Sequence, residues 1–168
     1  LTILPIFENA TRDQALNTGH GVAYLIHTDA TSILMDAGFN PDNLDPSPLA
    51  QNMARLSVTP DDFDTIYITH PHPDHVGGVT QWLNRTFALG VAQTDLSDEQ
   101  ILTPIPMTYP GASPEAAGAP RILAPGVATL GAIPFVDIFP LSLFRPQMIE
   151  QVLAVNVADV GVILITGC

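Results

Sequence analysis

The strongest constraint on this fold is a short segment in which histidines and an aspartate alternate with prolines. Residues 69–75 read Thr-His-Pro-His-Pro-Asp-His. Residues 70–75 directly follow residues 65–69, whose β-branched and aromatic side chains predict a strand. The two prolines exclude a regular helix and stiffen the chain. Because an extended backbone directs alternate side chains to one side, His70 and His72 can lie together. The segment therefore predicts a rigid turn at the end of a strand.

This order of side chains is typical of a site for two metal ions. His70 and His72 can bind one ion, while Asp74 and His75 reach a second ion beside it. Imidazole and carboxylate ligands together suit Zn²⁺, Fe, Mn²⁺ or Co²⁺, and two ions about 3.5–4 Å apart can share a bridging hydroxide. The alternative is a polar loop whose histidines face solvent. Three histidines and an aspartate directly after a strand favour the metal site.

The composition is that of an acidic, folded chain long enough for one domain. The 168 residues are 46% hydrophobic and 13% charged, which is typical of a chain with a core. The net charge is −12, and all five basic residues are arginines. Such a chain repels phosphate groups, so we expect neither nucleic acid nor an anionic membrane as a partner. We expect a small-molecule substrate, and the oligomeric state is not predicted.

Two further features concern the cell compartment and the cysteine chemistry. No apolar run is long enough to cross a bilayer and no signal segment is visible, so we expect a cytoplasmic protein. The chain begins at Leu1 rather than at a methionine, which leaves an exported protein as the alternative. The single cysteine, Cys168, excludes an internal disulfide and a cysteine-rich zinc site.

The first half of the chain has the pattern of an α/β unit. Short apolar runs alternate with polar turns, and the second and third runs are close enough for a hairpin. Apolar residues recur at helical spacing from Leu49 onward. Strands are predicted at residues 1–7, 21–27 and 32–36, and helices after residues 45–48 and over residues 79–83.

The second half is less regular. Five prolines stand among small residues between positions 104 and 120, and they predict an irregular insertion over residues 85–120. Strand character then returns, and the last two strands are expected to form a hairpin. These strands are predicted at residues 121–123, 127–130, 151–157 and 161–166.

The motif His-x-His-x-Asp-His resembles the signature of the metallo-β-lactamase superfamily. Residues 19–21, which lead into a strand, resemble the first hairpin of that family, and residues 35–38 resemble its Asp-x-Gly element. The resemblance implies an α/β fold, the αβ/βα sandwich, of which this chain would be the N-terminal part. It also implies two zinc ions, with Fe or Mn possible, and a role for Asp36 in supporting the metal ligands from behind.

A narrower branch of that family is suggested by the end of the chain. Residues 150–155 and 161–168 resemble metal-dependent hydrolases of β-lactamase superfamily II. That branch includes an enzyme that joins a dihydropterin to a ribofuranosylaminobenzene phosphate in methanopterin biosynthesis. In the branch a Ser-His pair follows the glycine and cysteine that stand here at Gly167 and Cys168. The resemblance therefore implies one incomplete domain over residues 1–168, and a gene that continues with a histidine within about three residues.

The function we expect is metal-dependent hydrolysis by a metal-activated water. Asp74 would bind the second ion and orient or deprotonate that water. Two alternatives stay open: the pterin-linked synthase, which forms a carbon–nitrogen bond, and a non-catalytic fragment with an incomplete metal site. A di-iron oxidoreductase is less favoured, because such relatives carry glutamate where His72 stands. We expect residues 1–168 alone to bind metal weakly and to have little activity, because the site would be half filled.

The remaining polar residues of interest are expected to be structural. His20 adjoins a glycine turn and His27 ends a strand, so neither is expected to bind metal. Cys168 is expected to be a small buried residue, although a thiolate can bind zinc. Trp82 is expected in the core. Glu150 resembles a glutamate of the same branch, and the sequence assigns it no physical role.

Overall fold

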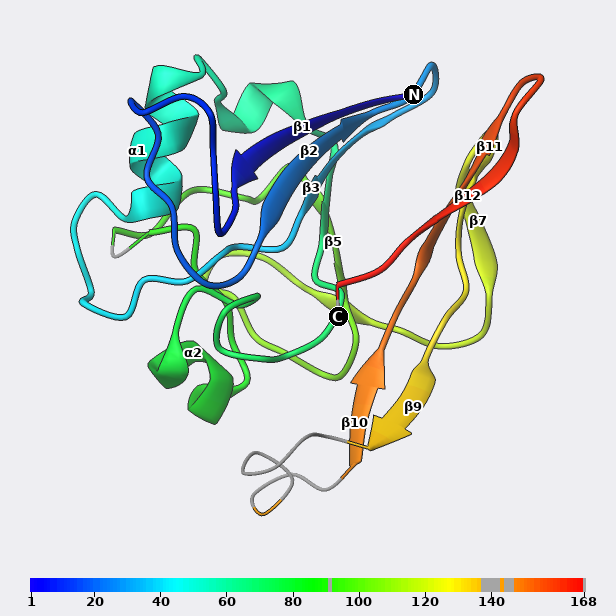
Figure 1. Ribbon diagram of the computed structural model, residues 1–168. Coiled ribbons are helices and arrows are strands. Elements are labelled where there is room, and N and C mark those ends of the chain that lie inside the picture. Colours follow the sequence, from blue (N-terminus) through cyan, green and yellow to red (C-terminus); the bar gives the residue numbers. More distant parts are fainter. Residues whose placement is uncertain (91, 137–142, 144–146, 168) are drawn as a thin grey trace.

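Two β-sheets form the framework of the protein in the computed structural model, which describes residues 1–90, 92–136, 143 and 147–167 (Figure 1). One sheet comes from the first two thirds of the chain, and the other comes from the last third. The strands are β1 (Thr2–Phe7), β2 (Ala23–His27), β3 (Ser32–Met35), β4 (Thr65–Tyr67), β5 (Gln100–Thr103), β6 (Glu115–Ala116), β7 (Arg121–Ala124), β8 (Val127–Thr129), β9 (Ile133–Val136), β10 (Gln147–Glu150), β11 (Leu153–Val157) and β12 (Gly161–Ile165). The helices are α1 (Pro48–Arg55), α2 (Val79–Asn84) and a 3₁₀ turn (Pro60–Asp62).

The first sheet has six strands in the order β1-β2-β3-β4-β5-β6. Strands β1, β2 and β3 are antiparallel neighbours, which confirms the predicted hairpin between β2 and β3. Strands β3, β4, β5 and β6 run parallel. Because the carboxyl ends of parallel strands meet at one edge of a sheet, the residues that follow β3 and β4 lie side by side there. These residues are Asp36 and the segment from Ile68 to His70, so the topology brings two predicted site elements together.

The second sheet packs on one face of the first. It is antiparallel, in the order β12-β11-β8-β7, and β9 and β10 form a separate two-stranded ribbon beside it (Figure 1). The hydroxyls of Tyr67 and Thr129 share a 2.8 Å hydrogen bond across the interface. Buried apolar side chains from both sheets fill the space between them: Ile26, Ile33, Met35, Tyr67 and Leu102 from the first, and Val127, Leu153 and Val155 from the second.

The opposite face of the first sheet packs against the helices. Helix α1 begins where predicted, because the Ser47 hydroxyl accepts a 3.0 Å hydrogen bond from the backbone N–H of Ala50 and Pro48 occupies the first turn. Trp82 on α2 is buried, as predicted for a core residue. Together these layers confirm the predicted α/β class, with helices on one side of the first sheet and the second sheet on the other. Within the described residues, no helix is long and apolar enough to span a membrane.

The outer face of the second sheet is apolar. Ile122, Ala128, Ala154 and Leu164 are successive cross-strand neighbours from β7 to β12. The side chain of Ile122 is 78% exposed, and that of Leu164 is 56% exposed. An antiparallel sheet with one solvated face normally carries polar residues on that face. This row of the outer face is therefore apolar, in contrast to that rule.

The irregular insertion predicted over residues 85–120 is wrong in one important part. This range contains β5, which lies inside the first sheet between β4 and β6. Its two central residues, Ile101 and Leu102, are buried on opposite faces of the sheet. A parallel strand buried on both faces shows no alternation of polar and apolar residues. The four-residue strand was therefore hidden by its shortness and by the proline that follows it.

Candidate metal centre

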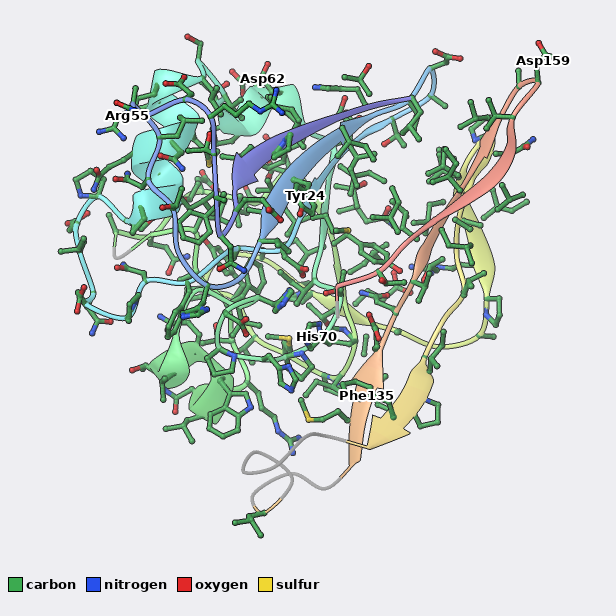
Figure 2. The ribbon with its side chains drawn as sticks, in the orientation of Figure 1. Tyr24, Arg55, Asp62, His70, Phe135 and Asp159 are labelled. Carbon is green, nitrogen blue, oxygen red and sulfur yellow. The ribbon has the colours of Figure 1, made fainter. Side chains whose placement is uncertain are left out.

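The three histidines of the turn lie together at the carboxyl edge of the first sheet, beside the β9–β10 ribbon. All three are buried. Nε2 of His70 lies 2.8 Å from Nδ1 of His72, and the ring centroids of His70 and His75 are 4.0 Å apart. Figure 2 shows His70 with Phe135 of β9 next to it. The Phe135 ring lies 6.2 Å from the rings of both His70 and His72, so it provides an apolar wall.

Asp36 joins the two parallel strand ends at this edge. Its carboxylate is fully buried. It accepts hydrogen bonds of 2.7 Å from the backbone N–H and from the hydroxyl of Thr69. Its Oδ2 atom also lies 2.7 Å from Nδ1 of His75. A buried carboxylate requires such partners, because desolvation of the charge is otherwise very unfavourable. Asp36 therefore fixes both the start and the end of the histidine turn.

The same hydrogen bonds determine which ring nitrogen carries the proton. Because the Thr69 hydroxyl donates its only hydrogen to Asp36, its 3.0 Å contact with Nδ1 of His70 requires that nitrogen to donate. Nδ1 of His75 likewise donates to the Asp36 carboxylate. Both rings therefore keep their lone pair on Nε2. A histidine whose second nitrogen donates to a carboxylate or a hydroxyl has the tautomer and the orientation of a metal ligand.

The protonation state of His70 is consistent with this tautomer. Burial, together with the smaller effects of the neighbouring His75 and His72 rings, lowers the pKa of His70 to about 2. His70 is therefore neutral at physiological pH. The neutral imidazole is the form that binds a metal ion.

Asp74 lies at the open side of the turn. Its side chain is 36% exposed, and Oδ2 lies 3.8 Å from Nε2 of His75. The loop before β2 packs on the backbone of this residue: a Cβ atom added at Gly21 would lie 1.9 Å from the Asp74 carbonyl oxygen. Gly21 also has a φ of +85°, a conformation that side chains with a Cβ atom rarely adopt. Only glycine fits there, and its close approach holds Asp74 beside His75.

The predicted ligands thus meet in one place, and they form two pairs. Nε2 of His70 faces Nδ1 of His72, and Nε2 of His75 faces the carboxylate of Asp74. Imidazole nitrogen and carboxylate oxygen are the chemistry that Zn²⁺ and its neighbours accept, so the donor set fits such ions. Within the described residues, however, no group of three or more His, Cys, Asp or Glu side chains is arranged to hold one ion. Metal binding by these four residues therefore stays a prediction.

The other two histidines and the cysteine do not join this cluster among the described residues. His20 is exposed, and Nδ1 of His27 lies 2.9 Å from the hydroxyl of Ser32 across the β2–β3 hairpin. Cys168 is outside the described residues. Sequence reasoning missed Thr69, although a hydroxyl directly before the first histidine is a signal that could have indicated it.

A cleft of about 250 Å³ lies on the helix side of the first sheet. Its lining includes Asn40, Gln81, Phe87 and Tyr109, and it includes none of the four predicted ligands. The cleft and the histidine cluster are therefore separate features of the molecule.

Comparison with known proteins agrees with this geometry. The family model of the metallo-beta-lactamase superfamily matches residues 16–102, which include Asp36 and the whole histidine turn. The chain belongs to the metallo-β-lactamase superfamily. No curated protein matches the sequence significantly.

Solved structures of similar fold include several lactone hydrolases. A quorum-quenching N-acyl homoserine lactone lactonase is 19% identical, with a TM-score of 0.53 over 96% of this chain and 67% of its own. An N-acyl homoserine lactone hydrolase with N-hexanoyl-L-homoserine at its catalytic metal centre is 18% identical, with a TM-score of 0.54 over 98% and 73%. A variant of AiiA from B. thuringiensis is 18% identical, with a TM-score of 0.53 over 98% of this chain and 73% of its own. At such identities the similarity shows the fold, and this chain spans only part of it.

Proposed function

We propose that this chain provides the histidine–aspartate half of a dinuclear metal centre in a metal-dependent hydrolase. The observation that carries the proposal is the buried Asp36 carboxylate, which orients His75 directly and His70 through Thr69. Such support behind the ligands is typical of metal sites and serves no purpose in a solvated loop. Lewis-acid activation of water near neutral pH is the chemistry that a zinc pair supplies when bound.

Each side chain of the turn has a distinct task in this proposal. His70 and His72 would hold one ion, and His75 with Asp74 would hold the second. Asp74 is the only one of the four with a substantially exposed side chain. Its carboxylate can therefore also accept a proton from an attacking water, or orient that water toward the substrate. Phe135 limits the access of bulk solvent to His70 and His72 from the β9 side.

The substrate class that we propose is a small neutral ester, with cyclic esters as the first to test. The structural neighbours named above act on N-acyl homoserine lactones, although their similarity to this chain shows only the fold. The chain carries a net charge of −12, so it disfavours phosphorylated or otherwise anionic substrates. Arg121 is one of its few arginines, and its guanidinium is already held in a bidentate ion pair with Glu115.

The pterin-linked synthase remains the second candidate, and one observation favours it. The Phe135 ring beside His70 and His72 offers an aromatic surface on which a flat pterin could stack. A phosphorylated second substrate argues against it, for the charge reason given above. Turnover of an ester without added pterin would distinguish the hydrolase from the synthase.

The test of the proposed function is the variant Asp74→Ala in the metal-loaded full polypeptide, which means the product of the complete gene. We expect it to lose most of its turnover of a generic lactone or ester, because it removes a ligand and the carboxylate that handles the proton together. His20→Ala is the control and should retain turnover, since His20 is exposed. Retention of full turnover and full metal content by Asp74→Ala would contradict the mechanism.

A further inference from the structure

We propose that Gln151 and Glu150, at the corner between β10 and β11, are positioning residues for the histidine turn. The inference rests on the proposed metal centre, and it assigns the second sheet a role in that centre. Neither residue belongs to the predicted ligand set. Each acts through a contact with the backbone that carries the ligands or with the segment that covers them.

Gln151 joins the second sheet to the strand that leads into the turn. Its side chain is 1% exposed. Its side-chain Nε2 donates a 2.8 Å hydrogen bond to the carbonyl of Ile68, and its backbone N–H donates a 2.8 Å hydrogen bond to the carbonyl of Thr69. These are the last two carbonyls before His70. One buried residue therefore pairs both of them.

These two carbonyls need partners from outside the first sheet. The ladder of β4 ends at Tyr67, and beyond it the N–H groups of Ile68 and Thr69 bind the Leu102 carbonyl and Asp36. Ile68 and Thr69 are buried, so a carbonyl left unpaired there would be unfavourable. Without the Gln151 side chain the Ile68 carbonyl loses its partner, so we expect the backbone from Ile68 to Thr69 to move, and the hydroxyl that orients His70 would move with it.

Glu150 holds Gly167, which follows the last strand, against Thr69 and His70. Its Oε1 accepts a 3.0 Å hydrogen bond from the backbone N–H of Gly167. A Cβ atom added at Gly167 would lie 2.1 Å from the Thr69 hydroxyl oxygen and 2.8 Å from Nδ1 of His70. Gly167 therefore covers the hydrogen bond that fixes the His70 tautomer. Glu150 keeps this cover in place.

The first experiment compares Gln151→Met with Tyr67→Phe in the full polypeptide. Methionine keeps the length and apolar volume of glutamine and removes the side-chain donor to the Ile68 carbonyl, while the backbone N–H that binds the Thr69 carbonyl remains. Tyr67→Phe is the matched control, because it removes a different buried hydrogen bond between the same two sheets. Titration with Co²⁺, followed by its visible absorption and by chelator competition, should show roughly 10–100-fold weaker binding in Gln151→Met. Tyr67→Phe should change the affinity by less than about threefold.

A second pair of variants tests Glu150. Glu150→Leu removes the acceptor of the Gly167 N–H, whereas Glu150→Gln keeps an oxygen in that place. We expect Co²⁺ affinity to fall in Glu150→Leu and to be largely restored in Glu150→Gln. Thermal unfolding of all variants without metal separates this effect from general instability. Equal affinities and spectra in Gln151→Met, Tyr67→Phe and the parent protein would show that Gln151 has only a structural role.

A metal-free measurement keeps the inference separate from the proposed function. Two-bond ¹H–¹⁵N spectra of the histidine rings report which nitrogen carries the proton. We expect His70 to be protonated at Nδ1 in the parent protein and in Tyr67→Phe, and to show a mixture in Gln151→Met. If this pattern is found but no metal binds, the positioning role of Gln151 is supported and the proposed metal centre is contradicted. If metal binds and the His70 tautomer is unchanged in Gln151→Met, the positioning role of Gln151 is contradicted, but the proposed metal centre is not.

Discussion

At the scale of single residues, Asp36 holds both histidines that keep their lone pair on Nε2. It contacts His75 directly and His70 through Thr69. It does so with three contacts of 2.7 Å, two of them to Thr69 and one to His75. The sequence predicted a supporting role for Asp36 by resemblance, and the geometry gives that role a physical content. Thr69 was not predicted, because a hydroxyl on a strand is most often only a surface or ladder residue.

The variant Asp36→Asn tests this content directly. An amide keeps the shape of the carboxylate but brings an NH₂ group to one of the three donors. We expect metal affinity to fall by roughly 10–100-fold, and the free energy of unfolding to fall by about 1–3 kcal/mol. Asp29→Asn, at an exposed hairpin residue, should change neither quantity. Metal titration and denaturant unfolding measure the two effects, and unchanged metal affinity in Asp36→Asn would contradict the role assigned to it.

Gly21 offers a second test at the residue scale. Alanine at Gly21 must adopt a φ of +85° and also place a Cβ atom 1.9 Å from the Asp74 carbonyl oxygen. Gly111 has a similar φ of +81° with no atom within 4 Å of an added Cβ. We expect Gly111→Ala to cost about 1–2 kcal/mol of stability from the backbone alone. Gly21→Ala should cost at least about 1 kcal/mol more, and unfolding curves of equal midpoint for the two variants would refute this packing.

At the scale of elements, local signals predicted most strands and both helices, while long-range pairing decided the rest. The β2–β3 hairpin and the start of α1 follow from turn and capping residues that stand next to each other in the sequence. The placement of β5 depends on β4 and β6, which are distant along the chain. The approach of Gln151 to Thr69 likewise joins residues far apart in sequence. No local pattern indicates such contacts, so the support from the second sheet was not predicted.

Helix α1 allows a prediction that separates stability from function. The Ser47 hydroxyl accepts from Ala50 N–H and donates to the Leu89 carbonyl at 2.5 Å. Ser47→Ala should therefore lower the free energy of unfolding by about 1–2 kcal/mol. It should leave metal affinity unchanged, because α1 packs on the face of the first sheet away from the second sheet, while His70 lies beside the β9–β10 ribbon (Figures 1 and 2). Thermal unfolding and Co²⁺ titration check both parts. An unchanged unfolding temperature would contradict the capping role.

At the scale of the whole molecule, the site lies where two sheets and several loops meet. Asp36 and the histidine turn follow strands of the first sheet, whereas Glu150 ends β10, Gln151 lies between β10 and β11, and Gly167 follows β12. The sequence predicted that His70 pairs with His72 and Asp74 with His75, because these residues are adjacent along the chain, while metal binding by them stays a prediction. It could not predict that Gln151 pairs the carbonyls of Ile68 and Thr69, since that contact depends on how the sheets pack. The centre is therefore a property of the assembled fold rather than of the motif alone.

Metal analysis of the purified full polypeptide tests the central claim most directly. The facing pairs of His70 with His72 and of His75 with Asp74 predict about two transition-metal ions per chain. A double variant, His70→Ala with His72→Ala, should lose about one of them. The metal content should be measured after dialysis against buffer without chelator, with circular dichroism to show that each protein is folded. Two ions in the parent protein and about one in the double variant would support the account. A folded parent protein that retains no metal, or a double variant that retains both ions, would contradict it.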